Sequence, residues 1–373
     1  MRIGFDVAQT CAERAGCGWY ADALIRALVT ISPQHQYFLY HQFGGWINGS
    51  ISNGTRIAAS NVTSVFENCP PEEAIRIWHD LPKLRTKIGL PDIVHANCYQ
   101  APIVPGAKLV YTIYDVSFWA VPEFTTEANR LICQDGVLSA LQNADGVIFI
   151  SQSAQDEFEL MLPGWLRHSG MPCAVTPLAA KTLPTLTPKA PAQGQYWLSV
   201  GSLEPRKNYD TLLDALALYW ERSQYRLPLR IAGGKGWKSD ALQSRIRELS
   251  RRGMVDYLGY VPDQDLSNLY AGAEAFIFPS WYEGFGLPVL EAMAHGCPVI
   301  SSDRTSLREV GGNAVLYIDP ASASAISALM LTLESDPGLR SKSSQAGLVQ
   351  AAKYDWQHTA RQTLEFYERV LGS

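Results

Sequence analysis

The chain has 373 residues, enough for two domains of ordinary size. Hydrophobic residues make up 47% and charged residues 18%, and the net charge of -5 argues against nucleic acid as the main partner, because phosphate binding needs a basic face. The seven cysteines include no CxxC pair, so neither a zinc site nor a disulfide framework is predicted. No apolar run approaches the roughly 20 residues that span a bilayer. Asp6 comes too early for a signal peptide, so we expect a cytosolic protein.

The first half of the chain alternates short apolar strands with helices, which predicts a parallel, doubly wound sheet. We expect strands at Ile3–Val7, Tyr37–Tyr40, Ile93–His95, Leu109–Ile113 and Val147–Ile150, and helices at Tyr20–Ile31, Glu72–Lys87, Glu127–Gln142 and Ala154–Met161. The stretch Lys181–Ala192 then contains three prolines and no periodicity, which predicts an interdomain linker.

A second series of strands and helices follows this stretch. We expect strands at Trp197–Val200, Leu229–Ala232, Val255–Leu258, Ala275–Phe278, Val299–Ser301 and Val315–Ile318, and helices at Tyr209–Tyr219, Asp240–Arg251, Gln264–Ala271, Ala321–Leu333 and Trp356–Val370. The fold class is therefore α/β, with two doubly wound Rossmann-like domains facing a cleft. In such sheets ligands bind beyond the carboxyl ends of the strands.

The most informative stretch begins at Glu283 and ends at Glu291. It follows a buried-strand pattern and leads into a helix that begins near Leu287, with Pro288 in its first turn. Glu291 lies among apolar residues, where a carboxylate is unfavourable unless a partner donates hydrogen bonds. Sugar or ribose hydroxyls are suitable partners. The alternative is a salt-bridged core residue.

Other polar residues follow the neighbouring expected strands. Arg206 and Lys207 come after the strand that ends at Val200 and suit a diphosphate, although they also fit a solvated loop pair. Gly233 allows close backbone approach after the next strand. The backbone of Tyr260 and Val261 follows a third strand and offers groups that can read a base edge. Together with the helix start after Glu283, these residues predict a cradle for a nucleoside-diphosphate sugar.

With these motifs the chain resembles the retaining GT-B glycosyltransferases of family 4, over nearly its whole length. The resemblance is most specific at Gly201–Asn208, Tyr257–Asp263 and Phe278–Val299, and the last segment matches the family's E-x7-E motif. It implies catalytic roles for three residues: Arg206 and Lys207 neutralise the donor diphosphate, and Glu283 holds the donor sugar. The donor-binding set it implies is Gly16, Gly18, Gly201, Ser202, Gly233, Tyr260, Val261, Gly284, Phe285, Gly286, Leu287 and, on the ribose, Glu291.

The resemblance also implies a division of labour between the domains. Residues 1–185 would form the acceptor-binding domain, residues 193–353 the nucleotide-sugar-binding domain, and 354–373 a helix that packs back on the first domain. Gly16 and Gly18 resemble the family's first glycine-rich loop. Relatives often carry His-Asp where this chain has Tyr114 and Asp115; the aspartate is kept as a catalytic-site candidate. Tyr114 and His95 are candidate acceptor contacts, and each has a structural alternative.

Other functions fit individual motifs. Gly16-Cys-Gly18-Trp-Tyr-Ala21 is a literal G-x-G-x-x-A, but it lies too far from the first strand for a dinucleotide fold and lacks the acid that binds ribose. Asp263-Gln-Asp265 is a literal D-x-D, but it follows Pro262 at a helix start, so we predict helix capping and no required metal. A non-catalytic sugar-nucleotide-binding protein, an epimerase and a phosphorylase of the same fold are the remaining alternatives.

The segment Thr112–Phe118 looks most like bacterial polysaccharide and lipopolysaccharide mannosyltransferases. GDP-mannose is therefore the first expected donor and a glycan or lipid-linked hydroxyl the acceptor, with no cofactor beyond the nucleotide sugar. Leu81–Ile88 carries three cations among apolar residues. It predicts either a peripheral contact with the inner face of the cell membrane or a solvated helix face.

Overall fold

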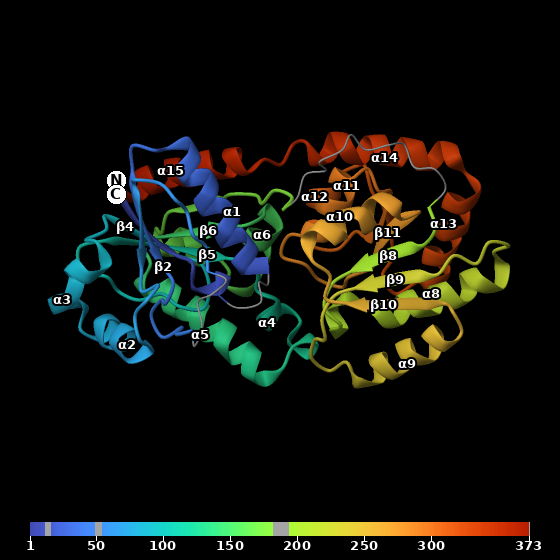
Figure 1. The fold of residues 1–373 in the computed structure, drawn as a ribbon, viewed down its shortest axis with the longest axis horizontal. Coiled ribbons are helices and arrows are strands. Elements are labelled where there is room, and N and C mark those ends of the chain that lie inside the picture. The colour runs from blue at the N-terminus through green and yellow to red at the C-terminus, as the bar shows by residue number, and fades with distance from the viewer. Residues whose placement is uncertain (12–15, 49–53, 182–193, 373) are drawn as a thin grey trace. The chain divides into compact units, whose positions relative to one another are not determined.

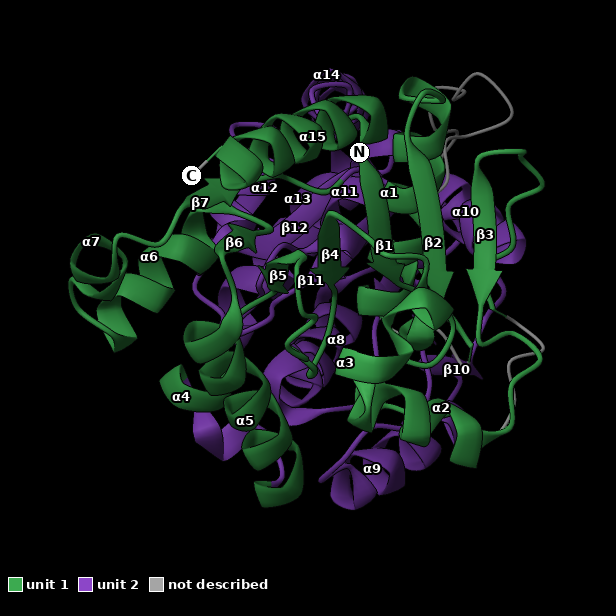
Figure 2. Cartoon of the chain, turned by 90° about the vertical axis from the view of Figure 1, so that its left-hand side faces the viewer, with its two compact units in different colours: residues 1–120, 127–178, 355–373 green, residues 121–126, 179–354 purple. Residues whose placement is uncertain are grey.

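The structure is a computed structural model that describes residues 1–11, 16–48, 54–181 and 194–372 (Figure 1). It divides into two compact units (Figure 2). Unit 1 comprises Met1–Ala120, Glu127–Leu178 and Asp355–Ser373, and unit 2 comprises Val121–Thr126 and Ala179–Tyr354. The expected domain limits at 185 and 193, and the expected linker beyond Lys181, lie outside the described residues.

Unit 1 contains a seven-stranded parallel sheet in the order β3-β2-β1-β4-β5-β6-β7. Phe5 of β1 pairs with Leu39 of β2 on one side and with His95 of β4 on the other. All five expected strands are confirmed, whereas the edge strands β3 and β7 were not expected, because they are short and only partly buried. The strands are β1 (Arg2–Asp6), β2 (Gln36–Tyr40), β3 (Val62–Val65), β4 (Ile93–Ala96), β5 (Lys108–Ile113), β6 (Gly146–Phe149) and β7 (Cys173–Val175).

Helices flank the sheet of unit 1. The prediction of a single helix at Glu72–Lys87 is wrong. The first helix ends at His79, with Asp80 as its C-cap, and Pro82 in the next turn has no N–H to continue the hydrogen-bond ladder. The C-terminal helix α15 packs against α1, as Figure 1 shows. The elements are η1 (Ala8–Thr10), α1 (Gly16–Ile31), α2 (Pro71–His79), α3 (Leu81–Leu84), η2 (Arg85–Ile88), α4 (Ser117–Ala120), α5 (Glu127–Asn143), α6 (Gln152–Met161), α7 (Trp165–Ser169) and α15 (Trp356–Gly372).

Unit 2 contains a six-stranded parallel sheet in the order β10-β9-β8-β11-β12-β13. The chain proceeds outward on one side of β8 and then returns to the other side, so β8 and β11 are neighbours at the topological switch point. Doubly wound sheets bind ligands at this point. The strands, all of them expected, are β8 (Trp197–Val200), β9 (Leu229–Ala232), β10 (Val255–Gly259), β11 (Ala275–Phe278), β12 (Val299–Ser302) and β13 (Leu316–Ile318).

The helices of unit 2 enclose a core that includes the fully buried Trp197. Helix α14 was not expected, because its small and polar residues give little helical periodicity. Among the described residues, no helix has both the length and the apolar character needed to cross a bilayer. The elements are η3 (Pro122–Phe124), η4 (Pro205–Lys207), α8 (Tyr209–Arg222), α9 (Asp240–Arg251), α10 (Asp263–Gly272), α11 (Leu287–Ala294), α12 (Ser306–Gly311), α13 (Ala323–Ser335) and α14 (Pro337–Ala351).

Candidate active site

A short helix and the side-chain hydrogen bonds of Asn208 fix the loop after β8. Pro205 starts the short helix η4, and Asn208 ends it in the left-handed conformation, with φ 58°. The side-chain amide of Asn208 donates to the carbonyl oxygens of Pro279, at 3.0 Å, and Pro320, at 2.7 Å. The first bond joins the loop after β8 to the loop after β11, and the second joins it to the segment after β13. The predicted cations Arg206 and Lys207 are thereby fixed beside the predicted carboxylate loop.

Arg206, Lys207 and Glu283 form one ion-pair cluster. Arg206 Nη1 donates to Glu283 Oε2 at 2.8 Å, and Lys207 Nζ donates to Glu283 Oε1 at 2.7 Å. Arg206 Nη1 also donates to the carbonyl oxygen of Tyr282 at 2.7 Å. Three of the predicted catalytic residues therefore meet at the carboxyl ends of the adjacent strands β8 and β11.

A second carboxylate, Glu204, completes the cluster. Arg206 donates to Glu204 Oε1 from Nη2 at 2.7 Å and from Nε at 3.1 Å. Glu204 is 2% exposed, so it lies beneath the guanidinium rather than in solvent. Two cations thus face two carboxylates. A diphosphate that bound here would share Arg206 with both carboxylates and Lys207 with Glu283.

The cluster is buried but remains ionic. Burial raises the pKa of Glu283, yet the charges of Arg206 and Lys207 outweigh this effect and hold the pKa below its usual value. Burial lowers the pKa of the Lys207 ammonium, and Arg206 lowers it further, while Glu283 opposes both. Paired charges in a buried site are strong because little water screens them, and this arrangement suits stabilisation of charge on a leaving group.

The loop after β11 presents Glu283 and then starts α11. The backbone N–H of Glu283 donates to Thr305 Oγ1 at 3.0 Å, and Ser306 Oγ donates to the Glu283 carbonyl oxygen at 2.8 Å. Gly286 has φ 94°, and a Cβ there would lie 2.6 Å from Leu307 Cδ2, so the tight entry to the helix needs glycine. The predicted residues Gly284, Phe285 and Leu287 line this entry, and Phe285 packs edge-on against Tyr354.

The neighbouring strand ends are closely apposed. Gly233 has φ 153°, and a Cβ there would lie 2.0 Å from the carbonyl oxygen of Gly201, so only glycine fits after β9. Ser202 is partly buried beside Gly201. Beyond β10, Tyr260 is 70% exposed and Val261 is half-buried. Apart from Glu291, the predicted donor residues of unit 2 therefore lie beyond the carboxyl ends of β8, β9, β10 and β11.

Glu291 lies apart from the ion-pair cluster, inside α11. It is 2% exposed, and Tyr270 OH donates to its Oε2 at 3.1 Å. Lys181 Nζ is 3.7 Å from Oε1. Glu204, Tyr270 and Lys181 are not among the residues predicted from the sequence. Glu204 lies two residues before the predicted Arg206, whereas Lys181 is the first residue of the expected linker and Tyr270 lies in the expected helix Gln264–Ala271.

In unit 1, His95 is enclosed by hydrogen-bonding side chains. It is fully buried, and its Nδ1 and Nε2 lie within hydrogen-bonding distance of Tyr367 OH, at 2.5 Å, and Thr112 Oγ1, at 2.7 Å. Burial lowers the pKa of His95 to about 3, so the ring is neutral. With both nitrogens occupied, His95 has no group left for an acceptor, which favours the structural alternative.

The other predicted residues of unit 1 lie in surroundings that differ from one residue to the next. Tyr114 packs edge-on against Tyr20, and its buried hydroxyl has no hydrogen-bond partner among the described residues. Asp115 Oδ1 accepts from the backbone N–H of Ser117 at 2.9 Å, at the start of α4. Gly16 and Gly18 form the first turn of α1, directly after residues 12–15, which lie outside the described part of the chain.

The literal D-x-D lies in the first turn of α10, where both acids favour the positive end of the helix dipole. The N-cap residue is Pro262, so neither acid occupies the capping position. Among the described residues, no three His, Cys, Asp or Glu side chains are grouped so that they can hold a metal ion.

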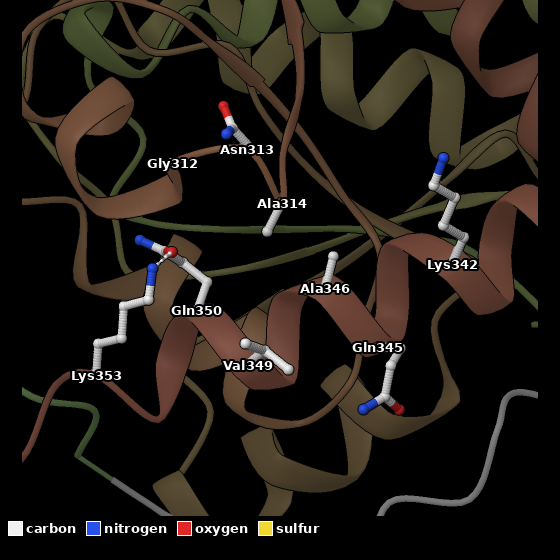
Figure 3. A pocket seen from close by; sticks show the side chains of 9 residues that line it. All are labelled: Gly312, Asn313, Ala314, Lys342, Gln345, Ala346, Val349, Gln350 and Lys353. Atoms are coloured by element: carbon white, nitrogen blue, oxygen red, sulfur yellow. Dashed lines mark hydrogen bonds between the residues drawn. The ribbon is translucent and has the colours of Figure 1, made fainter.

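A separate cavity of about 600 Å³ lies elsewhere in unit 2, between α14 and Gly312–Ala314. Figure 3 shows Lys342 and Lys353 on its wall, with Lys353 bonded to Gln350. None of the predicted site residues lines it.

Two Rossmann-like units, with an ion-pair cluster at the switch point of unit 2, fit an enzyme of the glycosyltransferase class, and comparison with known proteins gives the family. Residues 188–349 match the family described as "Glycosyl transferases group 1". The chain is 35% identical over 271 residues to the O-antigen chain mannosyltransferase B of Escherichia coli, covering 70% of each chain. The protein belongs to the group 1 glycosyltransferases.

Solved structures show the same fold. Sucrose-phosphate synthase from Thermosynechococcus elongatus matches with a TM-score of 0.70 and 20% identity, over 100% of this chain and 99% of that one. WaaG, a glycosyltransferase involved in lipopolysaccharide biosynthesis, matches with a TM-score of 0.66 and 16% identity over 100% of both chains. The expected GT-B fold class, with two parallel-sheet Rossmann-like domains, is confirmed.

Proposed function

We propose that this glycosyltransferase transfers a hexose from a nucleoside-diphosphate sugar to a hydroxyl of a glycan or lipid-linked acceptor, with retention at the anomeric carbon. GDP-mannose is the first donor to test, because a relative at 35% identity is named an O-antigen chain mannosyltransferase. The observation that carries the proposal is the buried cluster of Arg206, Lys207 and Glu283 at the switch point of unit 2.

In this proposal unit 2 binds the donor. Arg206 and Lys207 bind the diphosphate and stabilise the charge that develops on it as the bond to the sugar breaks. Glu283, which is shared between the two cations, accepts hydrogen bonds from the sugar hydroxyls, and the backbone from Gly284 to Leu287 offers N–H groups to the sugar or phosphates. Glu291 binds the ribose hydroxyls. Because the ion pairs form before the donor arrives, these groups need little rearrangement on binding.

Unit 1 binds the acceptor in this proposal. His95 is not one of its contacts, because both of its ring nitrogens are occupied. The buried hydroxyl of Tyr114 keeps unused hydrogen-bonding capacity among the described residues. The leaving phosphate oxygen accepts the proton of the attacking hydroxyl, and the two cations replace a metal ion in stabilising the leaving group.

A two-step experiment tests the proposal. Thermal shift with GDP, UDP and ADP identifies the preferred diphosphate, because a ligand that binds the folded state raises the melting temperature. Incubation with the matching sugar nucleotide and an acceptor glycan, followed by NMR of the new anomeric centre, then tests transfer and retention. We expect GDP to stabilise the protein most and mannose to be transferred with its α-configuration kept. An inverted product, or release of free epimerised sugar without acceptor, would overturn the proposal.

A further inference from the structure

Glu291 is an almost completely buried carboxylate with incomplete hydrogen bonding. Its Oε2 accepts one hydrogen bond, from Tyr270 at 3.1 Å, and its Oε1 has no hydrogen-bond partner among the described residues. The neighbours of Glu291 in α11 are apolar. A charged oxygen in such surroundings is unfavourable unless an opposite charge lies nearby. Lys181 supplies that charge, at 3.7 Å from Oε1.

Lys181 reaches this position from outside the helices and strands. It lies three residues after Leu178, the last residue of unit 1 in this part of the chain, and its side chain is only 18% exposed. The ammonium also lies 3.9 Å from Asp263 Oδ1, at the start of α10. Its side chain thus points toward two carboxylates of unit 2. This placement distinguishes Lys181 from an ordinary linker lysine, whose side chain would be solvated.

The groups around Glu291 have opposing electrostatic effects. Burial raises the pKa of Glu291, and Asp263 raises it further, whereas Lys181 and the Tyr270 hydroxyl lower it. His295 stacks on the Tyr270 ring, and its Nδ1 lies 2.8 Å from the Glu291 carbonyl oxygen. Burial lowers the pKa of His295, so it adds no positive charge at neutral pH. Lys181 is therefore the cation that favours ionised Glu291 among these groups.

The separation of Lys181 and Glu291 leaves the carboxylate able to bind a ligand. At 3.7 Å the ammonium and Oε1 attract each other, but this distance exceeds that of a hydrogen bond. Oε1 can therefore still accept a hydrogen bond from a ligand hydroxyl. Without a cation close by, the same carboxyl would take up a proton more readily and become a poorer acceptor.

We propose that Lys181 is a positioning residue for donor binding, which keeps Glu291 ionised and its Oε1 directed at the vicinal hydroxyls of the donor ribose. This inference rests on the proposed function, in which Glu291 binds the ribose. Lys181 acts through Glu291 and does not itself touch the nucleotide. It makes the affinity for a ribonucleotide depend on pH and on both ribose hydroxyls.

The test compares GDP with 2′,3′-dideoxy-GDP, by calorimetry on the full chain, at pH 6.0 and pH 8.5. The variants are Lys181→Met and the charge-preserving Lys181→Arg, with Lys342→Met as a control because Lys342 lies on the wall of the separate cavity. We expect Lys181→Met to weaken GDP binding about tenfold at pH 6.0 and much less at pH 8.5, because loss of the cation raises the pKa of Glu291 further and a carboxyl with a raised pKa binds a proton more readily at the lower pH. Dideoxy-GDP binding should barely change, and Lys181→Arg and Lys342→Met should match the wild type.

Two results would overturn the proposal for Lys181. One is wild-type GDP affinity of Lys181→Met at both pH values. The other is an equal loss for GDP and dideoxy-GDP, or a loss independent of pH, since a merely structural role would give either. Failure of the underlying function looks different: Glu291→Gln would then bind GDP as the wild type does, or the wild type would not distinguish GDP from dideoxy-GDP.

Discussion

The two sheets share the same strand order around their first strands but differ in the charge state of their carboxyl ends. In unit 1, burial lowers the pKa of His95 to about 3 and raises that of Asp6 to about 7, so both shifts favour the neutral side chain. In unit 2, Arg206 and Lys207 are paired with Glu283, whose pKa lies below its usual value. One sheet edge favours uncharged groups, whereas the other holds ion pairs.

This difference shows that topology alone does not decide the chemistry of a doubly wound domain. Both units offer a switch point, but among the described residues only the loops after β8 and β11 place two cations against a shared carboxylate. The bond from Asn208 to Pro279 is the structural cause, because it fixes the two loops together. The comparison therefore supports the proposal that unit 2 binds the diphosphate, and each prediction below tests that proposal.

The largest effect is expected from removing a member of the cluster. Arg206→Ala and Glu283→Ala should each lower kcat by about 10²–10³, because each removes a charge beside the reacting centre. Turnover with GDP-mannose measures the effect, and circular dichroism should show that folding is preserved. Arg245→Ala is the matched control, since Arg245 is a surface cation of unit 2 that pairs with Asp210 and Asp214. Near-wild-type turnover of either cluster variant would contradict the assignment.

The neutral edge of unit 1 should make its stability sensitive to acid. The pKa of His95 is lowered by burial to about 3 in the folded protein. A histidine with a depressed folded pKa contributes stability above its unfolded pKa, near 6.5, and this is lost as pH falls toward 3. Between pH 6.5 and pH 5 the free energy of unfolding should fall by about 2 kcal/mol from this group.

Urea unfolding of the wild type and His95→Asn at both pH values measures this effect. The variant should be less stable at neutral pH, because it loses the bonds to Tyr367 and Thr112, but its stability should change less with pH. The same pH dependence in both proteins would show that His95 is not the responsible group.

A smaller effect is expected for Glu204→Gln. The variant keeps a hydrogen-bond acceptor beneath Arg206 but loses the negative charge that holds the guanidinium from Nε and Nη2. We expect kcat to fall about tenfold, the loss of roughly one charge-assisted bond. Steady-state kinetics with GDP-mannose measures it. A loss as large as that of Arg206→Ala would mean that Glu204 acts directly on the donor.

No effect is expected from chelation. If Arg206 and Lys207 neutralise the leaving diphosphate, then EDTA should leave turnover unchanged and added Mg²⁺ or Mn²⁺ should not increase it. The assay is transfer from GDP-mannose after dialysis against EDTA. A clear loss of transfer that a divalent cation restores would replace the proposed role of the two cations with a metal ion.

Much of the fold could be predicted from local sequence. Most strands of both sheets are short apolar runs at regular intervals, and their alternation with helices predicts that both sheets are parallel. The short strands β3 and β7 and the polar helix α14 could not be predicted, because tertiary contacts rather than periodicity stabilise them. The end of the helix within Glu72–Lys87 has a local signal in the sequence, because Pro82 lacks the N–H that a continuous helix would need.

The candidate site was partly predictable for a similar reason. Arg206, Lys207 and Glu283 were identified because each directly follows an apolar strand, and strand ends meet at one edge. Lys181 could not be identified, because its proximity to Glu291 joins positions more than a hundred residues apart. The contact between His95 and Tyr367 could not be predicted for the same reason. Tyr367 lies in the C-terminal helix, and no local sequence pattern connects that helix to β4.

The affinity of GDP for the wild type, Arg206→Ala and His95→Asn, measured by calorimetry at pH 8, tests the central comparison most directly. We expect Arg206→Ala to lose GDP binding by at least about tenfold, the range of one charge-assisted contact to phosphate, and His95→Asn to bind GDP as the wild type does. Wild-type affinity in Arg206→Ala, or an equal loss in His95→Asn, would contradict the assignment of the diphosphate to the charged edge of unit 2.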